Sequence, residues 1–376
     1  MSQLRSIDAR STALRKQIMR RYLQRLRKEM RGVSGHTSPV TWWKQHSTNV
    51  IDSLTLAELE AAILADETVA VELEVQGAPT PELYYDPRVV AGTTGDGRTV
   101  HGLVAAGVNK AATVYDTGTV EEVAAAWEQT KRFLALAGTT AISDASRTSS
   151  AASMLTRPRT KYVRMINPPT CARCLVLAGK TASRPTMGFK RHPGCDCAMV
   201  AVYDWDRRKS DPMYQSLYFD NTTYFNSLSA ADQDKLLGKA GAQAVRDGAD
   251  FNQVVNANRG MTTVTDKFGA KRKVTTEGTT KRGMASKYMQ AQMGGRFKKT
   301  PGSKYTRLPV ARLTPEEIYK VAGRDSDKAR VLMHQYGYLT DVDPRLGELW
   351  GDPKLAADIA KLYDKTGTAL RRGIRL

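Results

Sequence analysis

The sequence predicts an α+β fold that is predominantly helical, with a small β region in the middle of the chain. Three observations lead to this prediction. Amphipathic segments with capping residues recur along most of the 376 residues, only two short runs have strand character, and all four cysteines lie between those runs. A chain of this length is expected to hold two or three domains.

Capping residues and glycines give the expected helix boundaries. Thr119 and Glu122 form a capping box, and the helix that follows is expected to end before Gly138. A second helix is expected over residues 229–248. A third is expected over residues 314–323, with a proline at its first position.

A narrow apolar stripe repeats every fourth residue near the N-terminus: Leu14, Ile18, Tyr22, Leu26 and Met30. Arg and Lys fill the other faces of this predicted helix, which Gly32 and Gly35 should end. Such a helix can lie on anionic lipid, contact DNA phosphates, or be an amphipathic helix of the core. We favour a helix that docks its stripe on a neighbouring subunit while its basic face meets a polyanion.

The net charge of +19 is concentrated in two segments. Residues 1–31 carry ten Lys or Arg against two acids, and residues 256–307 carry thirteen against two. Residues 52–100 carry ten acids against two Arg. This segregation favours basic arms that bind a nucleic acid, with the acidic stretch facing a basic partner or folding back on the arms. The expected DNA-binding residues are Arg15, Lys16, Arg20, Arg21, Arg27, Lys28, Lys271, Arg272, Lys273, Lys281, Arg282, Lys298 and Lys299.

The second basic segment is rich in Gly, Thr, Lys and Arg, a composition that predicts a flexible arm and not a core. A long solvated linker is the alternative. Cations on a mobile tether would neutralise phosphates without recognising a sequence, so binding should weaken steeply with added salt.

The four cysteines form the most specific motif of the chain. Cys171 and Cys174 make a CxxC arm, and Cys195 and Cys197 follow about 20 residues later, with His192 close by. This spacing is typical of a zinc knuckle, in which thiolates surround the ion tetrahedrally. Four cysteine ligands are expected, with His192 either replacing one of them or standing behind them.

Disulfides and plain buried thiols are the alternatives. The chain starts without an apolar signal region, so it is expected in the reducing cytosol, where clustered thiols more often hold metal. Four protein ligands leave no open position for a catalytic water, so the zinc is expected to be structural. The zinc would hold a small sheet together, because residues 162–166 and 198–203 have strand character and flank the cysteines.

No convincing catalytic motif accompanies this cluster. The histidines are scattered, and nucleotide-binding loops and hydrolase motifs are absent from the sequence. Asp204 and Asp206, on either side of Trp205, are expected in a charged surface turn.

The cysteine region resembles a known family. The runs at residues 162–174, 177–179 and 189–197 are similar to the cysteine and His-Pro motif of MuF-like minor capsid proteins of tailed bacteriophages. Those at 238–250 and 254–261 resemble the segment that follows this motif in the same family. The Arg-His-Pro-x-Cys-Asp-Cys form resembles phages of actinobacterial hosts. The resemblance is specific over residues 160–261, looser over the helical region before them, and thin beyond residue 310.

This resemblance implies a head-morphogenesis protein inside the virion that is made in the host cytoplasm. Its expected partners are the portal or the major capsid protein, double-stranded phage DNA bound nonspecifically, and further copies of itself in a ring. No membrane is expected among them. An enzyme is not expected either. The alternative functions are a zinc-dependent nuclease or toxin-like enzyme packaged with the genome and, least favoured, a host transcription regulator.

Five segments are expected. They are a basic N-terminal helix or arm (1–50), a helical domain (51–157), a MuF-like zinc-knuckle domain (158–255), a basic flexible linker (256–310) and a C-terminal helical segment (311–376).

Overall fold

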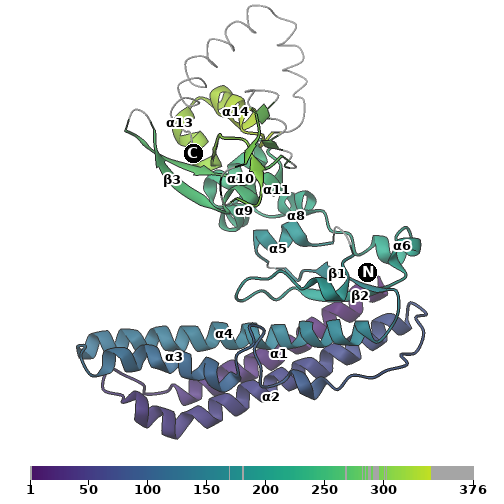
Figure 1. Ribbon diagram of the computed structural model, residues 1–376, viewed down its shortest axis with the longest axis vertical. Helices are drawn as coiled ribbons and strands as arrows, with labels where there is room; N and C mark the ends of the chain where they lie inside the picture. Colours follow the sequence, from purple (N-terminus) through teal and green to yellow (C-terminus); the bar gives the residue numbers. More distant parts are fainter. Residues whose placement is uncertain are drawn as a thin grey trace, which may run out of the picture. The chain divides into compact units, whose positions relative to one another are not determined.

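The computed structural model describes residues 2–339, apart from residues 169, 180–181, 267–268, 282, 284, 287–288, 291–295, 300 and 302. It is mostly helical, with 58% helix and 10% strand, which confirms the predicted fold class (Figure 1). The chain divides into two compact units. The first comprises residues 1–170 and 177–220, and the second comprises residues 171–176 and 221–376.

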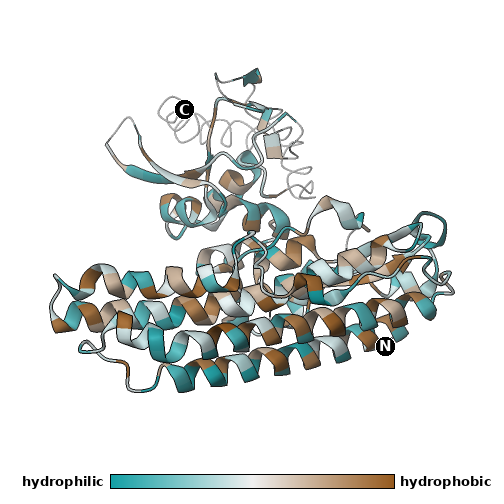
Figure 2. Ribbon diagram, turned by 60° about the horizontal axis from the view of Figure 1, so that its bottom comes forward, coloured by the Kyte–Doolittle hydropathy of each residue, from teal (hydrophilic) through white to brown (hydrophobic). Residues whose placement is uncertain are grey.

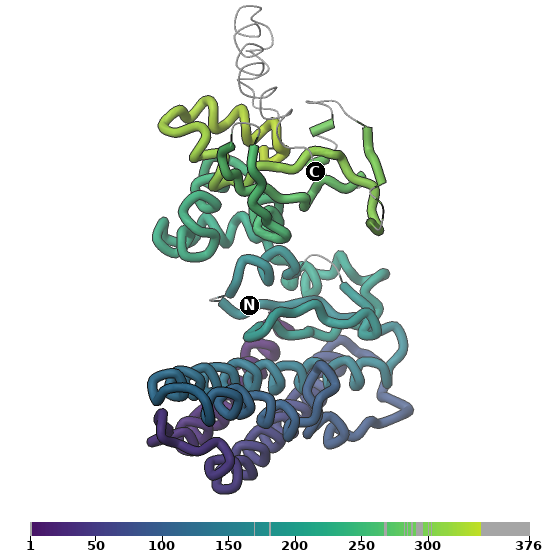
Figure 3. The backbone as a smooth tube through the Cα atoms, turned by 60° about the vertical axis from the view of Figure 1, so that its left-hand side comes forward, coloured from purple at the N-terminus to yellow at the C-terminus, as the bar shows by residue number. Residues whose placement is uncertain are grey.

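Long helices make up most of the first unit. They are α1 (Gln3–Glu29), α2 (Pro39–Glu74), α3 (Val100–Tyr115) and α4 (Val120–Leu155). Each begins at a hydroxyl residue whose side chain accepts a backbone N–H: Ser2, Ser38, Thr99 and Thr119. The predicted capping box of α4 is present. Figure 2 shows polar and apolar residues alternating around these helices, and Figure 3 traces their paths.

The apolar stripe of α1 is buried inside the first unit. Ile18, Tyr22, Leu26 and Met30 join one hydrophobic core with residues of α2, α3 and α4, while Leu14 is exposed. The expectation that this stripe docks on a neighbouring subunit is therefore wrong for its buried residues. A stripe of this kind is the ordinary way in which a helix joins a bundle.

Helix α4 continues well beyond Gly138, where the sequence suggested an end. A Cβ atom on Gly138 would lie 2.3 Å from the Oη of Tyr22, which donates a hydrogen bond to the carbonyl of Leu134 (2.9 Å). The glycine therefore makes room for the Tyr22 ring between α1 and α4. It does not terminate the helix.

The predicted strands form an antiparallel pair, β1 (Thr160–Met165) with β2 (Ala198–Tyr203). Both faces are covered by apolar side chains, and Val163 and Val200 face each other in register. Two side chains, one from α2 and one from the turn that follows it, satisfy part of the free edge of β2. Glu72 accepts the N–H of Ala201 (2.7 Å), and Gln76 donates to its carbonyl (2.9 Å).

Short elements lie in the connections: η1 (Pro87–Val90) between α2 and α3, α5 (Ala172–Leu177) and η2 (Pro185–Met187) between β1 and β2, and α6 (Trp205–Arg208) and α7 (Pro212–Gln215) after β2.

The second unit combines small helices with short strands. The helices are α8 (Asn221–Ser227), α9 (Ala230–Leu237), α10 (Lys239–Arg246), α11 (Phe251–Ala257), α13 (Pro315–Ala322) and α14 (Ser326–Gln335). The single helix expected over residues 229–248 is divided at Gly238, whose φ of 74° does not continue a helix. The helix after Thr314 ends at Gly323, as predicted.

Much of the second basic segment is folded, so the prediction of a flexible arm is wrong for those residues. β3 (Met261–Thr265), β4 (Lys271–Thr275) and β7 (Arg312–Leu313) form one sheet, and β5 (Lys298–Lys299) pairs with β6 (Thr306–Arg307). Val274 and Leu308 are buried. Arg312 is fully buried over the ring of Tyr338 and donates to three backbone carbonyls: those of Glu277 (3.0 Å), Tyr336 (2.8 Å) and Gly337 (3.4 Å).

Among the described residues, no helix is both long enough and apolar enough to cross a membrane. Residues 340–376, which make up most of the expected C-terminal segment, lie outside the described residues.

Candidate metal centre

The two arms of the cysteine motif lie on different local structures. Cys171 directly precedes α5, and Cys174 lies in the first turn of that helix. The backbone N–H of Cys174 donates to the Sγ of Cys171 (3.4 Å), so the CxxC turn brings both sulfurs to the same side. His192, Cys195 and Cys197 lie in the loop that leads into β2.

The structure gathers all five predicted ligands in two overlapping groups. Cys171, Cys174 and His192 form one, and Cys174, Cys195 and Cys197 form the other. Within each group the ligand atoms lie within 4.8 Å of one another. A tetrahedral zinc with bonds of about 2.3 Å separates its sulfurs by about 3.8 Å, so this spacing fits a metal shell. The cluster can therefore hold a metal ion.

Burial distinguishes the ligands. Cys174, Cys195 and Cys197 are buried, whereas Cys171 and His192 are partly exposed. Cys174 belongs to both groups, so a single ion near its sulfur would meet ligands from both arms.

Two arginines from the helices hold the backbone of the second arm. Arg147 of α4 donates to the carbonyls of Cys195 and Cys197, the latter at 3.1 Å. Arg15 of α1 donates to the carbonyl between them, that of Asp196, at 2.6 Å. Three consecutive carbonyls are thus bound by buried guanidinium groups, and the path of the loop is fixed independently of its side chains.

The same arginines place positive charge beside the thiols. Burial lowers the pKa of Arg15 and the neighbouring Arg147 lowers it further, while Asp8, Asp196 and Cys197 act in the opposite direction. Four thiolates around a divalent ion leave the centre with a net negative charge. Nearby guanidinium groups stabilise such a centre.

Asp144 of α4 ties the His-Pro segment to the same helix. Its carboxylate accepts hydrogen bonds from Arg147 (2.9 Å) and from Arg191 (3.0 Å), and its own side chain is only 9% exposed. Close by, Thr140 accepts the N–H of Gly194 (2.9 Å). The segment that carries His192 is therefore anchored on both sides.

Arg15 was expected to bind DNA, and its position in the structure excludes this role. The side chain is buried, and it supports the metal loop. Lys16 lies nearby and pairs with Asp196 (3.6 Å), and Arg21 pairs with Glu60 of α2 (2.5 Å). The remaining expected cations of α1 are exposed to solvent: Arg20, Arg27 and Lys28.

The second group of expected DNA contacts is also divided. Arg272 is held by Asp266 (3.1 Å) and Glu317 (3.0 Å), with 22% of its side chain exposed, so it is a poor candidate for a phosphate contact. Lys273 pairs with Glu316 (2.9 Å) on the surface. Four lysines are exposed: Lys271, Lys281, Lys298 and Lys299. Arg282 lies outside the described residues.

The sequence interpretation missed the arginine and aspartate supports of the loop. The signal in the sequence was a run of polar residues in the middle of α4. The structure buries its members Ser143, Asp144, Ser146, Arg147 and Ser150. A charged pair three residues apart, set among small residues in the middle of a long helix, indicates that another polar segment covers this face.

The chain matches the family described as VG15 protein over residues 85–221. No curated protein and no solved structure matches it. The matched region contains α3, α4, the β1–β2 sheet and all five candidate ligands. The finer MuF-like resemblance stays a prediction. Over just over a third of its length, the chain is therefore similar to the VG15 proteins, a phage-associated family.

Proposed function

We propose that this chain is a minor capsid protein of a tailed phage that acts inside the head. In this proposal it docks on the portal or the major capsid protein, self-associates in a ring, and contacts packaged double-stranded DNA without sequence specificity. The observation that carries the proposal is the match to a phage-associated family in a strongly basic chain. Assistance in assembly, packaging or ejection is the expected result.

The exposed cations of α1 support the DNA contact. Arg20, Arg27 and Lys28 point away from the buried stripe that fixes the helix in the bundle, and α1 is therefore a rigid element that presents positive charge to solvent. Phosphate contacts of this kind give affinity without sequence recognition. Lys298 and Lys299, which pair with β6 in the second unit, would add to the same effect.

We propose zinc as the metal of the cysteine cluster, in a structural role. Soft thiolate ligands favour zinc over harder oxygen-seeking ions. Enough sulfurs are present to complete a tetrahedral shell, and three of the four cysteines are buried, so a substrate would have poor access. A nuclease or toxin activity would need an open metal position with a general base beside it.

A salt titration of the purified full-length protein on duplexes of unrelated sequence tests the DNA contact. We expect similar affinities for all duplexes, with a logarithmic slope against salt of several units, because each neutralised phosphate contributes about 0.9. An affinity that stays flat between low and moderate salt contradicts the electrostatic model.

Two further measurements test the location and the enzyme alternative. Mass spectrometry of mature particles should detect the protein in the virion, at few copies relative to the major capsid protein. Incubation with plasmid DNA in the presence of zinc or magnesium should leave the DNA intact. Cleavage that disappears in Cys174→Ser while the fold is retained would favour the nuclease alternative.

A further inference from the structure

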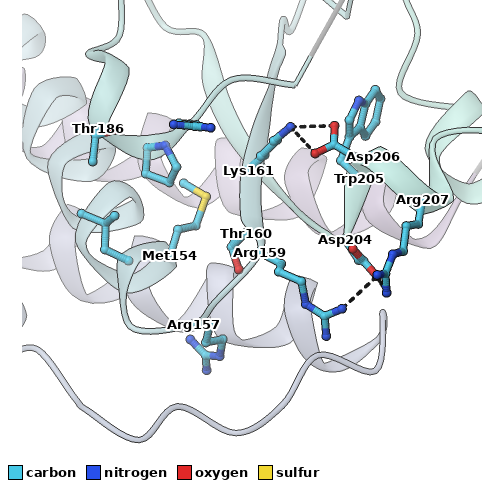
Figure 4. A pocket seen from close by; sticks show the side chains of 13 residues that line it. Met154, Arg157, Arg159, Thr160, Lys161, Thr186, Asp204, Trp205, Asp206 and Arg207 are labelled. Carbon is cyan, nitrogen blue, oxygen red and sulfur yellow. Dashed lines mark hydrogen bonds and ion pairs between the residues drawn. The ribbon is translucent and has the colours of Figure 1, made fainter.

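A basic pocket lies in the first unit, and its lining includes none of the candidate metal ligands and none of the cations of α1. It has a volume of about 510 Å³ and is formed by the end of α4, the start of β1, η2, and the junction of β2 with α6 (Figure 4). Five cations line it: Arg157, Arg159, Lys161, Arg184 and Arg207. Two carboxylates, Asp204 and Asp206, oppose them, which leaves an excess of three positive charges.

The carboxylates already hold three of these cations, as the dashed lines in Figure 4 show in part. Lys161 pairs with Asp206 (2.7 Å), while Arg159 (3.3 Å) and Arg207 (3.9 Å) both pair with Asp204. These pairs order Lys161 and Arg159, which both line the cavity.

The other two cations remain available. Within the described part of the chain, Arg157 and Arg184 have no hydrogen bond or ion pair through their side chains. Arg184 is near enough to Asp206 to help Lys161 lower the pKa of that carboxyl. Two guanidinium groups therefore face the pocket with donors to spare, in a site that already has excess positive charge.

The backbone at the mouth of the pocket is strained. Arg159 and Asp204 have φ values of 56° and 52°, the only non-glycine residues with positive φ in the described structure. The N–H of Asp204 donates to the carbonyl of Arg159 (3.0 Å), which extends the β1–β2 ladder by one step. The left-handed conformation costs about 1 kcal/mol or more for such residues, and it tends to persist where function requires it.

We propose that this pocket binds the phosphate group of a nucleoside phosphate, either free or at the end of a DNA strand. Arginine forks match phosphate oxygens in two-point geometry, and the excess charge suits a dianion. Ligand pockets of nucleotide size usually span about 300–1,000 Å³, a range that includes this cavity. Leu155, with 57% of its surface exposed, supplies apolar surface for the part of the ligand that carries no charge.

A phosphate monoester is favoured over the carboxylates of an acidic protein for a structural reason. The pocket already contains two carboxylates of its own, and it keeps two unpaired arginines beside them. A group with a higher charge and three peripheral oxygens can engage both arginines at once. A single carboxylate has only two oxygens to offer.

Calorimetric titration of the full-length protein tests the proposal with four probes. They are deoxyadenosine monophosphate, deoxyadenosine, and one short single-stranded oligonucleotide with either a 5′-phosphate or a 5′-hydroxyl. We expect the monophosphate to bind and the nucleoside not to bind. A preference for the 5′-phosphorylated strand identifies a DNA end as a source, and binding of the monophosphate alone identifies a free nucleotide. Failure of both phosphorylated probes to bind overturns the proposal. Binding of polyglutamate in place of the phosphorylated probes would overturn it as well.

The double variant Arg157→Gln with Arg184→Gln supplies the structural control. We expect it to weaken monophosphate binding by at least about tenfold, since charge-assisted hydrogen bonds to both guanidinium groups are lost. The matched variant Arg132→Gln with Arg324→Gln removes two exposed arginines elsewhere and should change binding less than about twofold. Equal weakening in both variants, with thermal unfolding unchanged, would show a general charge effect and reject the pocket.

This inference stands apart from the proposed contact with duplex DNA. Loss of the salt-dependent duplex affinity would leave monophosphate binding at the pocket unaffected. Conversely, a pocket that binds no monophosphate would leave the duplex contact of α1 untouched.

Discussion

Cys174 is the residue on which the metal centre depends most. It belongs to both three-ligand groups, and it is buried. Structural zinc sites contribute on the order of 10 kcal/mol to local folding, so we expect Cys174→Ser to lose bound zinc and to unfold at a clearly lower temperature. Elemental analysis of the purified protein and a thermal melt measure the two effects.

His192→Ala is the informative companion to this variant. If the four cysteines hold the ion, the His192 variant should keep one zinc per chain with only a small change in melting temperature. If His192 replaces a cysteine, it should lose zinc as Cys174→Ser does, and one of the other cysteine variants should retain it. Full zinc content in Cys174→Ser would contradict the assignment of a single centre.

Glu58 is expected to make the first unit sensitive to pH. Burial raises the pKa of this carboxyl to about 7, with a further contribution from Asp144, although the N–H of Gly92 donates to it (2.8 Å). The pKa of a glutamate in the unfolded chain is near 4.5. Between these values the folded state holds a proton that the unfolded state releases, so stability falls as pH rises through this window.

Glu58→Gln should remove this dependence. We expect the variant to gain stability relative to the unmodified protein as pH rises from 5.5 to 8, by about 2 kcal/mol. Urea unfolding of both proteins across this range measures the difference. Burial also raises the pKa of Asp8 to about 6 and that of Glu72, so some slope of the same sign should remain. Parallel stability profiles would contradict the assignment to Glu58.

At the scale of elements, the close approach of α1 and α4 explains why Gly138 lies inside a helix. Alanine is normally the better helix former by about 1 kcal/mol. At this position its Cβ would overlap the Tyr22 ring, so we expect Gly138→Ala to destabilise the protein by about 1–3 kcal/mol. Denaturant unfolding checks this.

Gly102→Ala in α3 is the matched control. A Cβ there would meet only the Thr99 hydroxyl, at 3.2 Å, so the change should be neutral or stabilising. Equal stabilisation by both substitutions would show that the Tyr22 ring moves aside freely.

Local signals in the sequence predicted most elements of the first unit. They failed where the local structure depends on a residue that is distant in the sequence. The capping box at Thr119 and the strands beside the cysteines are short-range patterns, and both are confirmed. The presence of Gly138 inside α4 is explained by Tyr22, which lies more than a hundred residues away. In the second unit, Arg272 is accommodated in a strand because Glu317 neutralises its charge. This ion pair joins residues far apart in the sequence, so no local pattern predicts it.

The candidate site shows the same division. The spacing of the cysteines identified all five possible ligands, because a metal site of this kind is encoded in two short arms. The supports Arg15, Asp144 and Arg147 could not be assigned, since an arginine on a helix has the same sequence signature whether it meets solvent, phosphate or a backbone carbonyl.

For the whole molecule, the net charge of +19 overstates the surface available to DNA, because several cations are engaged internally. We therefore predict that two sets of exposed cations dominate the salt dependence of duplex binding. Replacing Arg20, Arg27 and Lys28 by Gln, or Lys271, Lys298 and Lys299 by Gln, should each lower the logarithmic slope by about 2–3. Fluorescence anisotropy at several salt concentrations measures this.

The double variant Arg88→Gln with Arg98→Gln controls for net charge. Both arginines pair with adjacent aspartates, Asp86 and Asp96, so the slope should hardly change. A slope that tracks total charge regardless of position would contradict the assignment to these two surfaces.

The hydrogen bonds from Arg15 and Arg147 to three successive carbonyls have a consequence for sequence drift. Peptide groups are common to every amino acid, so the loop can accept many substitutions at residue 196 and lose only its weak surface pair with Lys16. Tolerance should be low at the two arginines, although neither would touch the ion itself. Homologues of this protein can therefore differ at residue 196, while α1 and α4 keep the two arginines that hold the loop.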